Sequence, residues 1–415
     1  MELHWMDEGA VRVRPGALKE NADLLLAIVK FAAKDKERVM RIPTDFLRGG
    51  DCGSLGEHPA FLAAEKAAWA KFDQRVKKIK NAPKIELKGR LAVRTWIGKG
   101  DDPRNPFLGH PEDVFVRQVL GLVRRLDAIG CRDVVIGLSG GLDSALALLV
   151  AVTAFYVLEL DLSGIHVYTM PGFGTTKRTR GNADLLCEGL ELTLETIDIT
   201  PACRRHFKDI GQDEANHDVT FENVQARMRT MILMDKANQC NGLVLGTGDM
   251  SEIALGWCTY NGDHMSMFGV NAGVPKTVVR EVCRWWADTN GGQAAEALYD
   301  ILATPVSPEL LPAQNGEIVQ KTEDRVGPYE LHDFFLWHFV AEQKGKKEIL
   351  AAAKKAFRAS YDAKTIARWL DVFFHRLFTQ AFKRNCAPDG VQVFPVYLAP
   401  NAWHVPSDIS ASWLA

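Results

Sequence analysis

Short runs of β-branched residues alternate with longer helical patterns between about residues 130 and 290. Four of these runs are typical of buried strands: DVVIGL at 133–138, IHVYTM at 165–170, TLETIDI at 193–199 and GLVLGT at 242–247. Apolar positions recur at helical spacing between them, over 144–158, 179–191 and 220–239. Strands that alternate with helices build a parallel sheet covered on both faces, so the pattern predicts a doubly wound α/β fold.

The residues before this region follow another pattern. A short strand at 11–13, a helix at 20–34 and a second strand at 37–43 predict one βαβ unit, with nothing after it to complete a sheet. Residues 60–100 are charged and have helical character. We expect an N-terminal α+β domain that is incomplete.

The segment 101–113 is rich in proline and is a natural boundary. Helical patterns follow the α/β region, at 328–343, 347–358 and 364–385. The last 30 residues carry four prolines and little periodicity, so they must dock on another element or stay loose. These patterns predict two domains, 1–105 and 106–415, the second ending in a helical segment.

Composition narrows the classes of partner. The 415 residues hold 50 Lys and Arg against 52 Asp and Glu, and a net charge of −2 gives no reason to expect nucleic acid or a membrane surface. A basic stretch at 71–90 has a single aromatic residue, which favours a solvated face. The eight cysteines form no CxxC pair, and the start resembles no signal peptide, so we expect reduced thiols in a cytoplasmic protein.

Three polar loops follow predicted strands: SGGLDS at 139–144, MPGFGTTKRT at 170–179 and GTGDMSE at 246–252. Ligands bind at the carboxyl ends of parallel strands, so these loops are candidate sites. Gly140 and Gly141 allow backbone N–H groups to approach a ligand, and the helix that follows directs its positive end to the same place. The first loop is therefore a candidate phosphate site. The alternative is an ordinary turn with Ser139 or Asp143 as helix cap.

Placed after a strand, SGGLDS resembles the pyrophosphate loop of the N-type ATP pyrophosphatases, which split ATP into AMP and pyrophosphate while adenylating an acceptor. It lacks the GK[ST] ending of a kinase P-loop. The resemblance implies that the serines and backbone N–H groups hold pyrophosphate and that Asp143 binds Mg²⁺.

Further motifs resemble NAD synthetase, most closely the synthetase half of glutamine-dependent, actinobacterial-type enzymes. They run in family order: TFENVQARMRT at 220–230, GLVLGTGDMSEIALGWCTYNGD at 242–263, NAGVPKT at 271–277 and FKR at 382–384. The resemblance covers about residues 115–410. It implies an ATP-dependent ligase that adenylates the carboxylate of deamido-NAD and forms the amide with nitrogen from ammonia. It also implies a homodimer, because the deamido-NAD site of that family is built across a subunit interface.

The resemblance assigns a role to each site residue. ATP would contact Ser139, Gly140, Gly141, Asp143, Ser144, Met170, Arg227, Thr247 and Lys276. Metal ligands would be Asp143 and Glu252, and these two with Lys276 would form the catalytic set. The deamido-NAD substrate would lie near Asn223, Asp263, Lys383 and Arg384.

The residues alone leave some of these roles open. Glu252 is placed to bind Mg²⁺, but a glutamate at a helix start is also a common dipole partner. Lys276 opens a helix after Pro275, where a cation is unfavourable unless an anion lies opposite, which favours a phosphate contact. For Arg227 or Arg229 a salt-bridged surface is the competing interpretation. We interpret His217 and His264 as structural or solvent-facing.

Residues 11–55 resemble the opening of the nitrilase-type domain that makes ammonia from glutamine in those enzymes. Where that domain carries a glutamate after a proline, Thr44 follows Pro43, and Cys52 is misplaced to act as the nucleophile. We expect a truncated, inactive glutaminase, so that free ammonia or an ammonia-delivering partner supplies the nitrogen. Two alternatives remain: a diverged paralogue that uses another carboxylate or amine, and a non-catalytic protein with a scaffold or regulatory role.

Overall fold

The computed structural model describes residues 39–42, 68–71, 74–78, 84–87, 99–304, 311, 322–400 and 402–409. The chain divides into two compact units, Met1–Thr95 and Trp96–Ala415. Among the described helices, none combines the length and apolar character that a membrane crossing requires. The seven cysteines of the described residues are all free.

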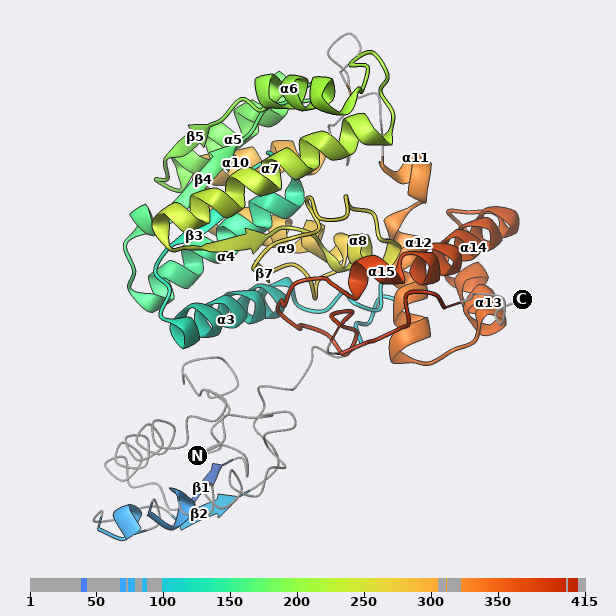
Figure 1. Ribbon diagram of the computed structural model, residues 1–415. Coiled ribbons are helices and arrows are strands. Elements are labelled where there is room, and N and C mark those ends of the chain that lie inside the picture. The colour runs from blue at the N-terminus through green and yellow to red at the C-terminus, as the bar shows by residue number, and fades with distance from the viewer. Residues whose placement is uncertain are drawn as a thin grey trace. The chain divides into compact units, whose positions relative to one another are not determined.

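In the first unit, strands β1 (Val39–Ile42) and β2 (Lys84–Leu87) pair in parallel (Figure 1). β1 falls within the strand expected at 37–43, whereas the elements expected at 11–13 and 20–34 lie outside the described residues, as do Thr44 and Cys52. Residues 68–71 are helical, as expected for 60–100, but β2 is a strand. Ile85 and Leu87 alternate with Lys84 and Glu86 there, which is the period of a strand.

The second unit is built on a five-stranded, wholly parallel sheet in the order β5-β4-β3-β6-β7 (Figure 1). Its strands are β3 (Val134–Gly137), β4 (Ile165–Thr169), β5 (Leu194–Thr196), β6 (Leu243–Gly246) and β7 (Phe268–Gly269). The first four are the strands that the sequence predicts. β7 has only two residues, too few for a periodic signal, and was not predicted.

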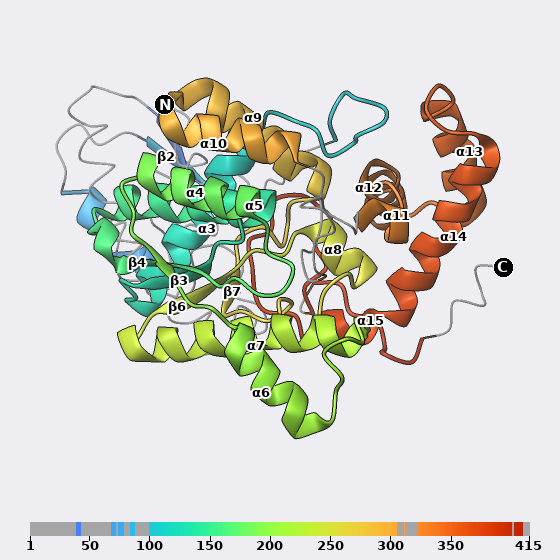
Figure 2. The ribbon, with the colours of Figure 1, turned by 90° about the horizontal axis from the view of Figure 1, so that it is seen from above.

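Helices cover both faces of this sheet (Figure 2). One layer contains α3 (Pro111–Ile129), α4 (Leu142–Leu158), α5 (Lys177–Gly189), α9 (Lys276–Asn290) and α10 (Gly292–Ala303). The other contains α6 (Thr200–Ile210) and α7 (Val219–Cys240). Successive residues of β3 alternate between the two cores, with Val134 and Ile136 in the first and Val135 in the second. The doubly wound parallel fold is therefore confirmed.

The direction in which the chain winds reverses between β3 and β6. From β3 the chain winds outward through β4 to β5, then crosses back to add β6 on the other side of β3. The loops after β3 and β6 therefore leave a switch point of the sheet in opposite directions, which is where open α/β sheets bind ligands. Helix α8 (Met250–Leu255) begins directly after β6 and belongs to this region.

The C-terminal segment is helical, as predicted. It contains α11 (Thr322–Val326), α12 (Tyr329–Leu336), a π-helix (Trp337–Ala341), α13 (Lys346–Ala356), α14 (Ala363–Thr379) and α15 (Ala381–Arg384). The single helix predicted over 364–385 is broken at Gln380, which packs against Gly256. The tail docks on the sheet edge: Gly269 N–H donates to Asp389 O at 2.8 Å, and Val391 N–H donates to Gly269 O at 3.1 Å.

Candidate active site

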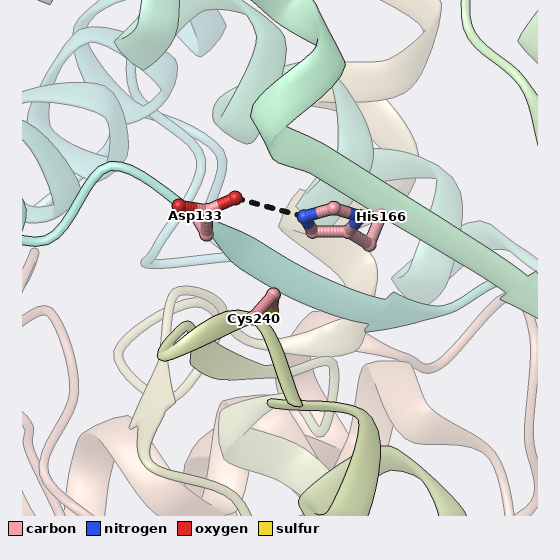
Figure 3. A group of neighbouring side chains, drawn as sticks. All are labelled: Asp133, His166 and Cys240. Carbon is pink, nitrogen blue, oxygen red and sulfur yellow. Dashed lines mark hydrogen bonds and ion pairs between the residues drawn. The ribbon is translucent and has the colours of Figure 1, made fainter. Parts of the chain in front are cut away.

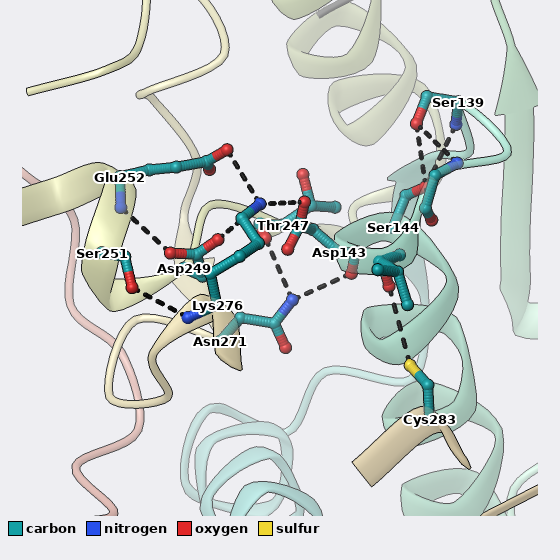
Figure 4. Close-up of polar contacts among 12 residues, drawn as sticks. Ser139, Asp143, Ser144, Thr247, Asp249, Ser251, Glu252, Asn271, Lys276 and Cys283 are labelled. Atoms are coloured by element: carbon teal, nitrogen blue, oxygen red, sulfur yellow. Dashed lines mark hydrogen bonds and ion pairs between the residues drawn. The ribbon is translucent and has the colours of Figure 1, made fainter. Parts of the chain in front are cut away.

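The glycine loop after β3 turns sharply into α4 (Figure 4). Gly140 has φ +82°, and a β-carbon there would lie 2.0 Å from the carbonyl oxygen of Thr179, so only glycine fits. Ser144 Oγ lies 3.0 Å from Ser139 Oγ and accepts from Ser139 N–H at 3.2 Å. Ser139 Oγ also accepts from Gly141 N–H at 3.2 Å. The two serine hydroxyls thus bond to each other and to N–H groups of the loop.

The N-cap residue of α4 is Gly141, which has no side chain to bond the first-turn N–H groups. Neither Ser139 nor Asp143 occupies the cap position, so the ordinary capped turn does not describe this loop. The dipole of a 17-residue helix favours an anion at this end. The loop therefore has the features of a phosphate site.

Lys276, the first residue of α9, is surrounded by three carboxylates (Figure 4). Its Nζ lies 2.6 Å from Asp143 Oδ2, 2.6 Å from Asp249 Oδ2 and 3.0 Å from Glu252 Oε1. The lysine side chain is only 5% exposed and that of Asp249 is 0% exposed, whereas Asp143 and Glu252 retain 23% and 21%. The two partly exposed acids are those that the resemblance assigns to Mg²⁺.

Charge and burial compete in this cluster. Burial acts to lower the pKa of Lys276, but Asp143, Asp249 and Glu252 outweigh it and raise that pKa well above its usual value. Burial also raises the pKa of Glu252 to about 7, and that of Asp249 well above its usual range, against the attraction of the lysine. Lys276 is thus a permanent cation among acids that gain from further positive charge.

The acids fit a hard divalent cation. One ligand oxygen from each of Asp143, Asp249 and Glu252 can be chosen so that all three lie within 4.8 Å of one another. Asp143 Oδ1 is buried and has no hydrogen-bond partner among the described residues. Carboxylate oxygens are the ligands that Mg²⁺ prefers, and a buried oxygen without a partner is costly unless an ion or water satisfies it. The donor set therefore fits Mg²⁺.

Asp249 belongs to the predicted GTGDMSE loop, but no role was predicted for it. It is the N-cap of α8, accepting from Glu252 N–H at 3.0 Å, while its other oxygen faces Lys276. An aspartate three residues before a glutamate is typical of a helix cap. That spacing is explained by the cap alone, so the sequence gives no sign that Asp249 also contacts Lys276.

Asp333, from α12, accepts hydrogen bonds from the first turn of α9. Its Oδ2 accepts from Thr277 N–H at 3.1 Å and from Thr277 Oγ1 at 2.7 Å, and its Oδ1 accepts from Ser251 Oγ. Ser251 Oγ in turn accepts from Lys276 N–H at 2.8 Å. Burial raises the pKa of Asp333 to about 6 against these bonds. The sequence carries no signal for this contact.

Asn271, within the NAGVPKT motif, joins the two site loops. Its Nδ2 donates to Asp143 O at 2.9 Å and to Thr247 O at 3.0 Å, and its Oδ1 accepts from Gln118 at 2.8 Å. One buried amide thus holds the loop after β6 against the start of α4. Neither Asn271 nor Gln118 was predicted as a site residue.

A second group of predicted residues lies around a pocket, partly open to solvent, that Glu252, Asp263, His264 and Lys383 help to line. Thr259 links two of the predicted substrate residues, because its Oγ1 donates to Asn223 Oδ1 and its N–H to Asp263 Oδ1, each at 2.8 Å. Burial raises the pKa of Asp263. Glu252 borders both this pocket and the lysine cluster, so the two regions adjoin.

The FKR motif holds α15 over the end of α8. Lys383 Nζ donates to Gly256 O at 2.8 Å and to Cys258 O at 2.7 Å, and Arg384 donates to Ala254 O at 3.0 Å. Lys383 and Arg384 both help to line the pocket, although Arg384 is only 3% exposed. His264 accepts from Asn261 N–H at 3.0 Å through Nδ1, and its Nε2 lies 3.1 Å from Lys383 O, which agrees with a structural role.

Three predicted ATP contacts remain: Met170 directly after β4, Arg227 on α7 and Thr247 directly after β6. Met170 is buried at the end of β4, and its carbonyl accepts from Arg229 Nε at 3.0 Å. Arg227 is exposed and donates to Tyr260 O at 3.2 Å. These two residues and Thr247 remain predicted ATP contacts.

Comparison with known proteins assigns this fold to a family. The NAD synthase family model matches residues 114–376, and the chain belongs to this family. A glutamine-dependent NAD(+) synthetase of Mycobacterium leprae is 41% identical over 324 residues, covering 72% of this chain and 48% of the relative. The corresponding protein of Mycobacterium tuberculosis H37Rv is 40% identical with the same coverage.

The chain thus spans about half the length of the curated relatives that it matches. The fold also resembles the crystal structure of a glutamine-dependent NAD(+) synthetase from Cytophaga hutchinsonii, with a TM-score of 0.73 at 13% identity and coverage of 97% of each chain. At that identity the similarity shows the fold alone.

Proposed function

We propose that this protein is an ATP-dependent ligase that adenylates the carboxylate of deamido-NAD and converts it to the amide with ammonia. One observation supports this most. The glycine loop after β3 lies beside the cluster of Asp143, Asp249, Glu252 and Lys276 at one switch point of the sheet. The first feature suits pyrophosphate and the second suits a metal-bound triphosphate.

A carboxylate is a poor electrophile because it is charged and lacks a leaving group. In the proposed reaction a carboxylate oxygen attacks the α-phosphorus of ATP, the bond to the β-phosphate breaks and pyrophosphate leaves. Ammonia then attacks the acyl carbon, a proton is lost, and AMP leaves with the oxygen it gained. Neither step requires a strong protein base, so alignment and charge screening carry the catalysis.

The chain's residues have distinct parts in this scheme. The loop N–H groups and the hydroxyls of Ser139 and Ser144 bind the leaving pyrophosphate. Lys276 exchanges part of its contact with carboxylates for phosphate oxygens and screens their charge. Asp143 and Glu252, the more exposed acids, would hold Mg²⁺, with Asp249 beside them. When bound, that ion would neutralise the triphosphate and polarise its phosphorus.

The acceptor would lie in the adjoining pocket, with its carboxylate directed to Glu252 and Lys276. Asn223, Asp263 and Lys383 would contact it, as would Arg384, which would also hold α15 in place. We propose a homodimer, because the deamido-NAD site of the family that the chain belongs to is built across a subunit interface.

We propose ammonia as the nitrogen donor because Thr44 replaces the expected glutaminase glutamate, and a hydroxyl cannot act as a carboxylate base. To test this, purified protein is given ATP, Mg²⁺ and deamido-NAD with either an ammonium salt or glutamine, and NAD is measured. Ammonium should support turnover and glutamine should not. Efficient use of glutamine would refute ammonia as the donor. ATP cleavage only with another acid would refute deamido-NAD as the acceptor.

A further inference from the structure

Three side chains with different donor atoms lie close together where the strands begin, at the end of the sheet opposite to the proposed active site. They are Asp133, His166 and Cys240 (Figure 3). A carboxylate oxygen, an imidazole nitrogen and the thiol sulfur all lie within 4.8 Å of one another. They precede or begin strands, whereas the acid–lysine cluster follows strand ends. The two groups are therefore separate sites.

Adjacent parallel strands bring the three donors together. Asp133 directly precedes β3, His166 is the second residue of β4, and Cys240 is the last residue of α7, just before β6. β3 pairs with β4 on one side and with β6 on the other. Each donor thus lies in a strand or within three residues of one, and such a rigid backbone suits a metal site.

The backbone beside the cluster is closely packed. Leu243 N–H donates to Asp133 O at 2.9 Å, and a β-carbon at Gly242 would lie 2.8 Å from Cys240 Sγ and 3.1 Å from Asp133 O. A glycine at 242 is thus what allows the thiol to approach the aspartate. His166 Nε2 lies 2.9 Å from Asp133 Oδ1.

A fourth donor is close by. Cys131 Sγ donates to the carbonyl oxygen of Asp133 at 3.1 Å, so a second thiol borders the same residue. The side chains of Asp133 and His166 are 34% and 27% exposed, which leaves access from solvent. Water that enters from this side would supply the fourth ligand of an ion held by the first three residues, because Cys131 Sγ contacts the main-chain carbonyl and lies outside the group of three donors.

We propose that Asp133, His166 and Cys240 form a binding site for a borderline-soft divalent ion of the zinc class. A set of one oxygen, one nitrogen and one sulfur suits Zn²⁺ or Co²⁺ and is foreign to Mg²⁺ or Ca²⁺, which take oxygen ligands. The bound ion joins β3, β4 and the turn from α7 to β6. It stabilises the sheet and takes no part in ATP chemistry.

The test is titration of the metal-stripped, full-length protein with Co²⁺, because cobalt bound to thiolate has a charge-transfer absorption that carboxylate-bound cobalt lacks. The intact protein should show this absorption, and Zn²⁺ should abolish it by displacement. Cys240→Ser should remove it, and His166→Gln should weaken binding by more than about tenfold. The exposed Cys386 supplies a matched control, because Cys386→Ser should leave the spectrum unchanged.

Two further measurements complete the test. Asp143→Asn should not alter the thiolate absorption, which separates this site from the carboxylate cluster. Zn²⁺ should raise the melting temperature of the intact protein but not of His166→Gln, whose partly exposed side chain makes misfolding a poor explanation. Absence of the absorption from the intact protein, or its persistence in both Cys240→Ser and His166→Gln, would overturn the proposal.

Discussion

Lys276 Nζ and Asp143 Oδ2 lie 2.6 Å apart, each in the first turn of its own helix, α9 and α4. A lysine at a helix N-terminus is opposed by the helix dipole, and burial makes the charge more costly still. Three carboxylates offset both costs. The same arrangement leaves an excess of acids that a metal ion can balance and a cation that phosphate can share.

Replacing Lys276 with methionine should destabilise the metal-free protein. The substitution leaves the buried Asp249 and two partly exposed acids without their cation, and breaking a buried ion pair typically costs about 3–5 kcal/mol. Urea unfolding in a chelating buffer measures the loss, and Mg²⁺ should restore part of it by replacing the missing charge. Lys354→Met, on the exposed face of α13, is the control and should change little. Equal stability of the two variants would contradict the role of the cluster.

Asp143→Asn should fold normally but lose Mg²⁺-dependent turnover by about a hundredfold or more, because it removes one charge from a proposed metal ligand and keeps the volume. The measurement is the turnover rate as a function of Mg²⁺ concentration. Asp184→Asn, on the exposed surface of α5, serves as the matched control. Near-normal turnover in Asp143→Asn would exclude Asp143 as a Mg²⁺ ligand and leave it only as an ion-pair partner of Lys276.

Glu252 should make the metal-free protein less stable as pH rises. Its pKa is raised from 4.5 in the unfolded chain to about 7 in the folded one, so the folded state holds its proton more tightly. The free energy of unfolding should therefore fall across that interval. Glu252→Gln removes the titrating group and should flatten this part of the profile, as measured by urea unfolding in a chelating buffer. Parallel profiles for the two proteins would refute the raised pKa.

Asp333 is a positioning residue, because it bonds the backbone beneath Lys276 and not the reacting groups. Asp333→Asn loses acceptor capacity for Thr277 and Ser251, which should cost about 1–3 kcal/mol of stability. We expect kcat to fall by about tenfold while KM for ATP changes little, because misplacement of a catalytic group costs rate more than binding. Asp371→Asn, a change on the exposed surface of α14, is the control. A loss confined to stability would make Asp333 purely structural.

The strands and loops of the site were predictable because they depend on local pattern. β3 and β6 are apolar runs with glycine-rich ends, and a parallel sheet brings such ends to one edge. Asp143 and Glu252 follow those ends, whereas Lys276 begins a helix after the unpredicted β7, and the structure brings all three together. Their roles came from family resemblance, since a lone aspartate or lysine has many other uses.

Long-range contacts were not predictable. Asp333 lies 56 residues beyond Thr277, in a helix whose pattern shows only packing. Asp249 has the spacing of a cap, and Asn271 acts through main-chain carbonyls that have no sequence signature. Arg384 lines the pocket, so its substrate contact stays a prediction, but the motif gave no sign that its guanidinium also donates to Ala254 O.

The central claim is that the carboxylate becomes bonded to AMP, and isotope transfer tests it most directly. Deamido-NAD with heavy oxygen in its carboxylate is converted by the protein with ATP, Mg²⁺ and ammonium, and the nucleotide product is examined by mass spectrometry. The account predicts AMP that carries one heavy oxygen, together with unlabelled pyrophosphate. Formation of ADP, or of AMP without the label, would contradict it.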